Sequence, residues 1–261
     1  MNKTALITGA SSGIGYELSQ IFAMEGYNLV LTARNTDKLN ELKNNLENQY
    51  NVQVSIITKD LALPDSSNEI YNEVVNKDII IDVLVNNAGL GDFGLFHESD
   101  IDKVNNIIEL NINSLTKMTR LFLPDMLKRK DGKILNIASL GSFQPGPLMA
   151  VYYASKAYVL SFSEAVSREL KNTGVTVTAV CPGPTNTEFN KKANFGTSGF
   201  IFNKHSASAK SVAVFSYKKM KKGKAVAVPG FFNKIASVGV RLLPKRIVRN
   251  MVYWLQKKRS K

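Results

Sequence analysis

The sequence predicts a doubly wound α/β fold, a parallel sheet covered by helices, in a single domain. Short β-branched runs alternate with amphipathic helical patterns along most of the chain, and a glycine-rich turn follows the first of these runs. Strands that alternate with helices at this spacing imply right-handed crossovers and a parallel sheet. The length of 261 residues suits one α/β domain, and the 44% apolar composition is enough for a buried core.

The expected strands are short, rich in Val and Ile, and bounded by polar or turn residues. After a first strand that ends at the glycine turn, they are Leu29–Ala33, Val52–Ile57, Ile81–Val85, Lys133–Ile137, Val175–Val180 and a late one at Ala225–Val228. Helical periodicity predicts helices at Gly15–Met24, Asp37–Asn48, around Leu110–Lys128 and at Ala154–Lys171.

No linker or repeat interrupts this pattern before about residue 190. We therefore expect one Rossmann-like domain over 1–261. Residues 1–188 form its cofactor-binding and catalytic core, and residues 189–261 form a substrate lid, the last strand and a basic C-terminal extension.

Charge is unevenly distributed. Residues 189–261 hold 18 of the 34 Lys and Arg residues and none of the 21 Asp and Glu residues, so the net charge is −5 before residue 189, +18 after it and +13 in total. Such a segment is either a solvated basic face or a contact surface for an anionic partner, such as a lipid surface, an acyl carrier or a phosphorylated substrate.

Targeting signals are not expected. The first strand begins so close to Met1 that no signal peptide fits before it, and no apolar run approaches the ~18 residues of a membrane span. The single cysteine, Cys181, suits a reducing compartment. We expect a cytoplasmic protein, bound at most to a membrane surface.

The turn after the first strand reads Thr8-Gly9-Ala10-Ser11-Ser12-Gly13-Ile14-Gly15. Such a turn allows backbone N–H groups and a helix N-terminus to approach a pyrophosphate, and the serine hydroxyls add donors. A plain strand-to-helix connection is the alternative, but the position of the turn at the start of a βαβ unit favours a dinucleotide. The cofactor residues expected here are Gly9, Ser11, Ser12, Gly13, Ile14 and Gly15.

The end of the second strand indicates which dinucleotide is bound. A site for NAD commonly places a carboxylate there to accept the ribose hydroxyls, whereas this chain has Ala33-Arg34. The guanidinium of Arg34 suits the 2′-phosphate of NADP. An ordinary surface arginine is the alternative, and Lys38 either assists or is simply solvated.

Two more segments follow strands and so reach the same edge of the sheet. Small residues in Asn86-Asn87-Ala88-Gly89 leave room for a dinucleotide, and Asp60-Leu61 is placed to border an adenine. Asn87, Ala88, Gly89, Asp60 and Leu61 are therefore expected cofactor contacts.

Tyr152 and Lys156 form the central catalytic pattern. Residues i and i+4 share a helix face, and a protonated Lys156 beside the phenol lowers the tyrosine pKa from its usual value of ~10. Ser139 precedes Tyr152 by 13 residues across a loop rich in Gly and Pro, where its hydroxyl can bond the substrate oxygen. Tyr153 is the rival acid/base residue, but four residues later it meets Ala157 instead of a cation.

Taken together, these motifs resemble the short-chain dehydrogenase/reductase superfamily, in its compact single-domain branch. The resemblance covers residues 3 to about 190, and the matching motifs are Thr8-Gly9-x-x-x-Gly13-x-Gly15, Asn86-Asn87-Ala88-Gly89, Asn111, Ser139, Tyr152-x-x-x-Lys156 and Pro182-Gly183.

This resemblance implies a catalytic tetrad. Tyr152 would be the acid/base residue, and Lys156 would bind the nicotinamide ribose. Ser139 would orient the substrate oxygen, so Ser139 and Tyr152 are the expected substrate contacts. Asn111 would hold a water in the proton relay. Asn113 competes for that role, but only Asn111 has a small residue, Ser114, three positions later.

The resemblance further implies contacts of Pro182, Gly183 and Thr187 with the carboxamide end of the nicotinamide, and a homodimer or homotetramer. The expected activity is NADP(H)-dependent hydride transfer between nicotinamide and a carbonyl or secondary alcohol. Neither a metal site nor a nucleic-acid partner is expected. Two alternatives are a nucleotide-sugar epimerase or dehydratase and a non-catalytic dinucleotide-sensing protein.

The substrate side is less defined. Phe189, Phe195, Phe200 and Phe202 lie in a stretch rich in Gly, Ser and Asn, as in a substrate lid, and apolar residues there suit a fatty acyl chain, a sterol or an aromatic ketone. They can equally anchor a loop to the core.

A basic amphipathic helix is expected after Pro244. Ile247, Val248, Met251, Val252 and Leu255 share one face, and basic residues lie opposite. Such a helix can lie on an anionic membrane, cap the substrate cleft or join a subunit interface.

Overall fold

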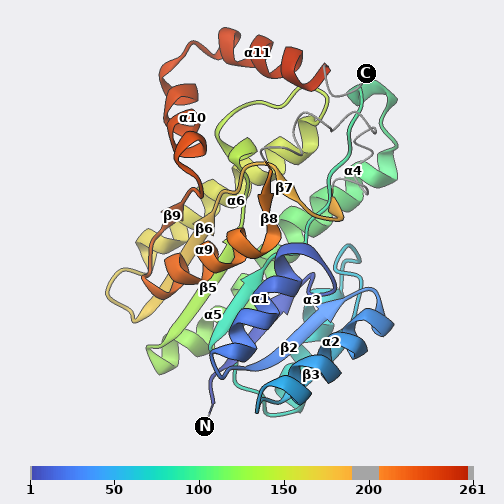
Figure 1. Cartoon of the computed structure of the whole chain (residues 1–261), viewed down its shortest axis with the longest axis vertical. Helices are drawn as coiled ribbons and strands as arrows, with labels where there is room; N and C mark the ends of the chain where they lie inside the picture. Colours follow the sequence, from blue (N-terminus) through green and yellow to red (C-terminus); the bar gives the residue numbers. More distant parts are fainter. Residues whose placement is uncertain (1, 190–205, 258–261) are drawn as a thin grey trace.

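The computed structural model describes residues 2–189 and 206–257, which form one α/β domain around a seven-stranded sheet (Figure 1). The strand order is β3-β2-β1-β4-β5-β6-β9, and every pairing is parallel. The strands are β1 Thr4–Thr8, β2 Asn28–Ala33, β3 Val54–Thr58, β4 Val83–Asn86, β5 Gly132–Ile137, β6 Val175–Val180 and β9 Val226–Ala227. The predicted fold class is confirmed.

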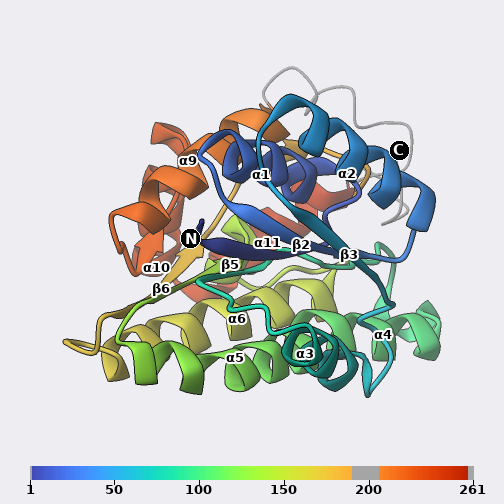
Figure 2. The ribbon, with the colours of Figure 1, turned by 90° about the horizontal axis from the view of Figure 1, so that it is seen from below.

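Helices cover both faces of the sheet (Figure 2). One face carries α1 Gly13–Met24, α2 Thr36–Gln49 and α9 Ala209–Lys221, and the other carries α3 Ser66–Asn76, α4 Ile101–Ile108, α5 Leu115–Arg129 and α6 Ala150–Glu169. Because both faces are covered, the strands are buried along almost their whole length, which explains their continuous apolar runs.

The chain reverses direction across the sheet between β1 and β4. The strands before this point lie on one side of β1, and those after it lie on the other. In open α/β sheets, ligands bind at the carboxyl ends of the strands beside such a switch point. The fold therefore places the loops after β1, β4, β5 and β6 around one site.

The predicted strands are confirmed to within about two residues, but the predicted helices need corrections. The helix predicted around Leu110–Lys128 corresponds to α5, and its first residues lie in a π-helical segment, Glu109–Ser114, that joins α5 to the preceding α4. The catalytic helix begins at Ala150 instead of Ala154, so Tyr152 lies in its first turn.

Four α-helices of the described residues were not predicted: α3, α4, α9 and α10, which spans Phe231–Leu242. The final helix, α11, spans Lys245–Lys257, as expected. A short parallel ribbon joins β7 Thr185–Asn186 to β8 Ala207–Ser208, so the chain after β6 returns beside itself before α9. Among the described residues, no helix is both long and apolar enough to cross a membrane.

Candidate active site

A cavity of about 1160 Å³ opens at the carboxyl end of the sheet and gathers most of the predicted site residues in its wall. The predicted residues in this wall are Gly9, Ser11, Ser12, Gly13, Ile14, Arg34, Asp60, Leu61, Asn87, Ala88, Gly89, Ser139, Tyr152, Lys156, Pro182, Gly183 and Thr187. Gly15 and Asn111 are absent from it and support the wall from behind.

The glycine turn has no room for side chains. Gly9 has a φ of +66°, and a Cβ there would lie 2.9 Å from Asn87 Nδ2. A Cβ on Gly15 would collide with the Gly9 carbonyl and with the Asn87 amide. Both glycines are therefore required by close backbone approach, and a turn of this kind presents backbone N–H groups to a pyrophosphate.

Thr8 connects this turn to the loop after β4, a role that the sequence did not reveal. Its Oγ1 accepts hydrogen bonds from the backbone N–H groups of Asn87 and Ala88, both at 2.9 Å. In return, Asn87 Nδ2 donates to the Thr8 carbonyl at 2.9 Å. The two loops that form the floor of the cavity are thus fixed to each other.

Arg34 lies exposed at the end of β2, on the rim of the cavity. Its Nη1 lies 3.4 Å from Asp60 Oδ2, so the two predicted cofactor residues form an ion pair. Lys59 also lines the cavity and pairs with Glu69. Lys38 instead forms an ion pair with Glu188 at 3.0 Å.

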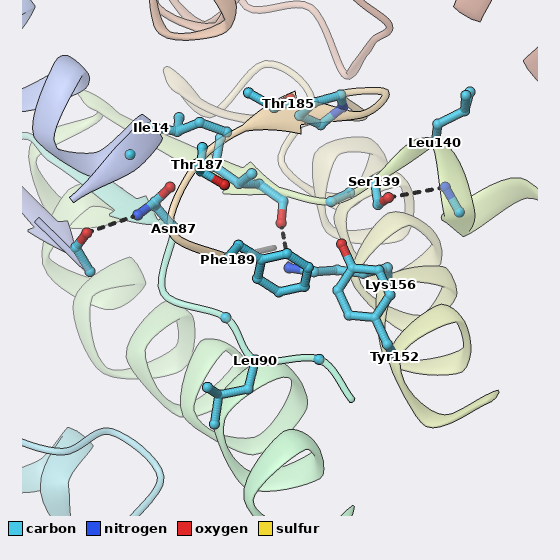
Figure 3. Close-up of a pocket in the computed structure, with 18 of the residues that line it drawn as sticks. Ile14, Asn87, Leu90, Ser139, Leu140, Tyr152, Lys156, Thr185, Thr187 and Phe189 are labelled. Atoms are coloured by element: carbon cyan, nitrogen blue, oxygen red, sulfur yellow. Dashed lines mark hydrogen bonds between the residues drawn. The ribbon is translucent and has the colours of Figure 1, made fainter. Parts of the chain in front are cut away.

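Tyr152 and Ser139 face the same space from α6 and from the loop after β5 (Figure 3). Burial raises the pKa of Tyr152 to about 12, and its hydrogen bond with Ser139 opposes this rise. Ser139 also caps the short helix Leu140–Phe143, because its Oγ accepts from Gly141 N at 3.0 Å. The serine hydroxyl is thereby fixed beside the phenol.

Lys156 is buried one turn further along α6. Its Nζ donates to the Ile137 carbonyl at 2.8 Å, and burial lowers its pKa to about 8. Ser142, which the sequence analysis did not identify, donates from Oγ to the Lys156 carbonyl at 2.7 Å. The ammonium group is thus directed at the end of β5.

The expected lowering of the Tyr152 pKa by Lys156 is wrong for the protein by itself. The pKa of Tyr152 lies above its ordinary value, because burial outweighs the stabilisation of the phenolate by Ser139. A positive charge or an added hydrogen-bond donor bound beside the phenol would lower this pKa.

Asn111 occupies the π-helical segment and is almost fully buried. Its Oδ1 accepts from Leu90 N, while Nδ2 donates to the Leu90 carbonyl and to Ser155 Oγ, all at 2.9 Å. Asn113 is exposed and bonds Glu109. The structure therefore places Asn111, and not Asn113, beside α6 at Ser155, between Tyr152 and Lys156 in sequence, and π-bulges are frequent at functional sites.

The segment from Pro182 to Thr187 borders the cavity and runs from the Ser139 loop to the glycine turn. The Pro182 carbonyl accepts from Leu140 N at 2.7 Å, which ties it to the Ser139 loop. Thr187 lies above the turn, where a Cβ on Gly13 would approach its Cγ2 to 3.1 Å. This position suits the predicted contact with the nicotinamide end of a dinucleotide.

The substrate side is built largely from parts that the sequence did not assign. Asn233, Ala236, Ser237 and Val240 of α10 line the cavity, as do Met251, Val252, Leu255 and Gln256 of α11. Phe189 packs on Tyr152, with ring centroids 5.2 Å apart. The other predicted lid residues, Phe195, Phe200 and Phe202, lie outside the described residues.

Gln256 anchors α11 to the loop between Ser139 and α6. It is 2% exposed, and its Nε2 donates to Tyr153 Oη at 2.9 Å. The Tyr153 ring in turn packs against Gly141 and Gly146 of the loop between Ser139 and α6. Tyr153 therefore joins α11 to the catalytic loop.

The predicted apolar face of α11 is divided in the structure. Val248 and Val252 are buried, while Met251 and Leu255 border the cavity. Ile247 remains exposed. Of the three arrangements considered for this helix, capping the substrate cleft is the one that these contacts support.

This set of features defines a class, an α/β oxidoreductase with a dinucleotide cradle and a Ser-Tyr-Lys cluster in one cavity. The family model for short chain dehydrogenases matches residues 3–197, and the chain belongs to this family. No cluster of His, Cys, Asp or Glu able to hold a metal ion occurs in the part of the chain that the structure describes.

Relatives agree with this assignment. An uncharacterized oxidoreductase from Staphylococcus epidermidis is 31% identical over 74% of this chain and 83% of its own. The very-long-chain 3-oxoacyl-CoA reductase of Mus musculus is 36% identical over 70% of this chain, but the match spans only 59% of the mouse enzyme.

Solved structures of two oxidoreductases are also similar. The short-chain dehydrogenase from Sphingobium yanoikuyae in complex with NADPH is 30% identical, with a TM-score of 0.83 over 92% of this chain and 94% of its own. The L-sorbose reductase from Gluconobacter frateurii, complexed with NADPH and L-sorbose, is 28% identical, with a TM-score of 0.77 over 87% of this chain and 94% of its own.

Proposed function

We propose that this chain is an NADP(H)-dependent oxidoreductase that interconverts a hydrophobic ketone and its secondary alcohol, with Tyr152 as acid/base residue. One observation carries the proposal: the Tyr152 hydroxyl, hydrogen-bonded to Ser139, faces the same cavity as the glycine cradle. A dinucleotide held in that cradle can therefore extend to a substrate held at Tyr152.

The residues fit a dinucleotide. A Cβ on Gly9 or Gly15 would collide with neighbouring protein atoms, so both glycines keep the turn tight enough to present backbone N–H groups to a pyrophosphate. NADP is favoured over NAD because Arg34 stands on the rim where the adenosine 2′-phosphate would lie, next to Lys59. NADPH in the similar Sphingobium and Gluconobacter structures supports the same choice.

Proton transfer depends on the environment of Tyr152. NADPH, when bound, supplies the hydride. With a pKa of about 12 in the protein alone, Tyr152 is protonated at neutral pH and can donate to a carbonyl oxygen that gains charge during reduction. Ser139 donates a second hydrogen bond to that oxygen, and Lys156 would bind the nicotinamide ribose.

Asn111 is proposed to support a proton relay. Its side-chain bonds to Leu90 and Ser155 use both amide protons and one lone pair of Oδ1. The side chain therefore offers little to a water, and the π-helical backbone around it is the better candidate for holding one.

The substrate class follows from the wall of the cavity. Phe189, Val240, Met251 and Leu255 give the substrate side an apolar lining, which suits a long acyl, steroid-like or aromatic ketone. The similarity to a very-long-chain 3-oxoacyl-CoA reductase supports an acyl substrate, while the sorbose reductase shows that a similar fold also accepts a sugar.

Assembly and location remain predictions. A homodimer or homotetramer is proposed on family grounds, and light scattering on the purified protein would measure it. The cytoplasmic location rests on the single buried cysteine.

The direct test is a substrate panel followed by NADPH absorbance. We expect turnover with 3-oxoacyl thioesters or bulky ketones, and much less with NADH. Turnover of a nucleotide sugar without net cofactor consumption would favour the epimerase or dehydratase alternative. Cofactor binding with no turnover on any carbonyl class would favour a dinucleotide sensor.

A further inference from the structure

The outer face of α10 is an exposed apolar stripe. Phe231, Ile235, Val238 and Leu242 recur at the helical period and all are exposed, with Phe231 at 73% and Leu242 at 80%. Phe232 beside them is 84% exposed. The opposite face of the same helix lines the cavity. The stripe is therefore not the side that packs on the protein.

The outer face of α11 continues this surface with cations and an aromatic residue. Val248, Val252 and Gln256 are buried, so the residues on the opposite side face outward. Those residues include Ile247 and Trp254, the latter 56% exposed, and the exposed bases Arg246 and Lys257. We define the outer surface as the following exposed residues of α10, α11 and the turn between them: Phe231, Phe232, Lys234, Ile235, Val238, Leu242, Leu243, Lys245, Arg246, Ile247, Arg249, Tyr253, Trp254 and Lys257.

The charge of the outer surface indicates what kind of partner covers it. Residues 189–261 contain no Asp or Glu, so the outer surface has only positive charges. Within the described part of the chain, Lys234, Lys245, Arg246 and Arg249 form no ion pair. A second copy docked face to face would bring like charges together, which is unfavourable.

The lysines at the end of α9 and the bases of α10 and α11 lie at two different ends of the molecule. The lysines at the end of α9 lie before β9, at the amino edge of the sheet, whereas α10 and α11 follow β9 at the carboxyl edge (Figure 1). Only the second group is combined with exposed Phe, Leu and Trp side chains. The lysines at the end of α9 therefore form a solvated basic face, whereas the bases on α10 and α11 belong to a surface that combines positive charge with apolar side chains.

We infer that the outer surface docks on an anionic lipid bilayer. Apolar side chains on α10 would enter the headgroup region, Trp254 would lie at the interface, and Lys245, Arg246 and Arg249 would face anionic headgroups. Exposed apolar groups of this extent on one face, rimmed by cations, are typical of membrane contact.

Docking would also place the substrate side of the cavity at the bilayer, because the inner faces of α10 and α11 line it. This consequence rests on the proposed function, since it expects a lipid-dissolved ketone as substrate. The docking itself does not rest on the proposed function, because it is measured without turnover.

The test is co-flotation of the full-length protein with vesicles. We expect flotation with phosphatidylcholine–phosphatidylglycerol vesicles at low salt, and little flotation with phosphatidylcholine alone or at high salt. Each base beside an anionic surface contributes roughly a fivefold factor in partitioning, so Lys245→Gln/Arg246→Gln/Arg249→Gln should weaken binding roughly a hundredfold. Phe231→Ser/Phe232→Ser/Leu242→Ser should also weaken binding to the anionic vesicles, because it removes the apolar side chains that would enter the headgroup region.

The matched control is Lys218→Gln/Lys222→Gln/Lys224→Gln, which removes the same charge from exposed lysines at the end of α9. It should retain most of the binding. Absence of flotation with anionic vesicles would overturn the proposal, as would an equal loss in the α9 control. Self-association that the serine variant abolishes, without vesicle binding, would assign the surface to a second copy instead. Turnover of a water-soluble ketone, which these variants should keep, reports separately on the proposed function.

Discussion

The two sides of the cavity are built by different forces. The catalytic wall, formed by the loops after β1, β4 and β5 and the start of α6, is fixed by hydrogen bonds between side chains and backbone, as at Thr8, Asn111 and Ser142. The substrate wall, formed by α10 and α11, is fixed mainly by apolar packing and by the Gln256–Tyr153 hydrogen bond.

This difference has a functional reason. Hydride and proton transfer require atoms at fixed separations, and directional hydrogen bonds provide this. Binding an apolar substrate requires only a dry wall of suitable shape, which nondirectional packing provides. The catalytic wall should therefore tolerate almost no change, while the substrate wall should change affinity more than rate.

A glycine next to each wall gives the largest expected contrast. Gly15→Ala would bring a Cβ against the Gly9 carbonyl and Asn87, whereas Gly239→Ala on α10 meets nothing within 4 Å. Overpacking of this kind costs about 1–3 kcal/mol, so NADPH affinity should fall about ten- to a hundredfold for Gly15→Ala. Gly239→Ala should be neutral or slightly stabilising. Fluorescence titration with NADPH would measure both, and equal affinities would contradict the account.

Lys156 gives the next largest effect, as a dependence of stability on pH. Its pKa in the folded protein is about 8, below the ordinary 10.5, so the unfolded chain binds more protons between these values and stability rises with pH across that window. Below about pH 8, Lys156 is charged in the folded protein, and burying this charge then lowers the free energy of unfolding most.

Urea unfolding of the cofactor-free protein would measure this cost. Lys156→Met should be more stable relative to the wild type at about pH 7 than at about pH 10, by about 2 kcal/mol. A difference that stays constant with pH would show that Lys156 keeps its ordinary pKa in the fold.

Substituting Arg34 tests phosphate recognition at the rim of the cavity. Losing a charge-assisted bond to a phosphate costs about 1.5–3 kcal/mol, so Arg34→Ala should raise the Kd for NADPH about tenfold or more and leave that for NADH nearly unchanged. Lys38→Ala is the control, since Lys38 pairs with Glu188. Equal effects on the two cofactors would remove Arg34 from phosphate recognition.

Gln256 should give the smallest effect, and mainly on KM. Gln256→Leu removes the bond to Tyr153 Oη, and one lost neutral hydrogen bond costs about 1 kcal/mol, or about fivefold in KM. Asn250→Leu, at an exposed position of the same helix, should leave steady-state kinetics unchanged. A fall in kcat with an unchanged KM would place Gln256 with the catalytic wall instead.

The catalytic wall could be predicted from the sequence because its requirements are local. A glycine turn after a strand and a Tyr-x-x-x-Lys on a helix follow from backbone geometry and from the helical period, so spacing alone reveals them. What spacing could not show was how far burial would raise the Tyr152 pKa, since that depends on neighbours from several loops.

The substrate wall could not be predicted because its residues are defined by tertiary contacts. Gln256 and Ser237 look like surface residues until α10 and α11 fold over the cavity. The π-helix at Asn111 was also missed, because one extra residue in a helical turn leaves no compositional signal. Amphipathicity predicted α11 but not which face is turned inward.

The central claim, that Tyr152 transfers the proton, is tested most directly by two neighbouring tyrosines. Their rings lie 6.0 Å apart; Tyr152 is hydrogen-bonded to Ser139, and Tyr153 Oη accepts from Gln256 Nε2. With a substrate from the panel, Tyr152→Phe should lower kcat by about 100-fold or more with NADPH binding intact, because general acid catalysis contributes about 10²–10⁴-fold. Tyr153→Phe should keep kcat and change only KM. Full turnover by Tyr152→Phe, or its loss in Tyr153→Phe alone, would contradict this assignment.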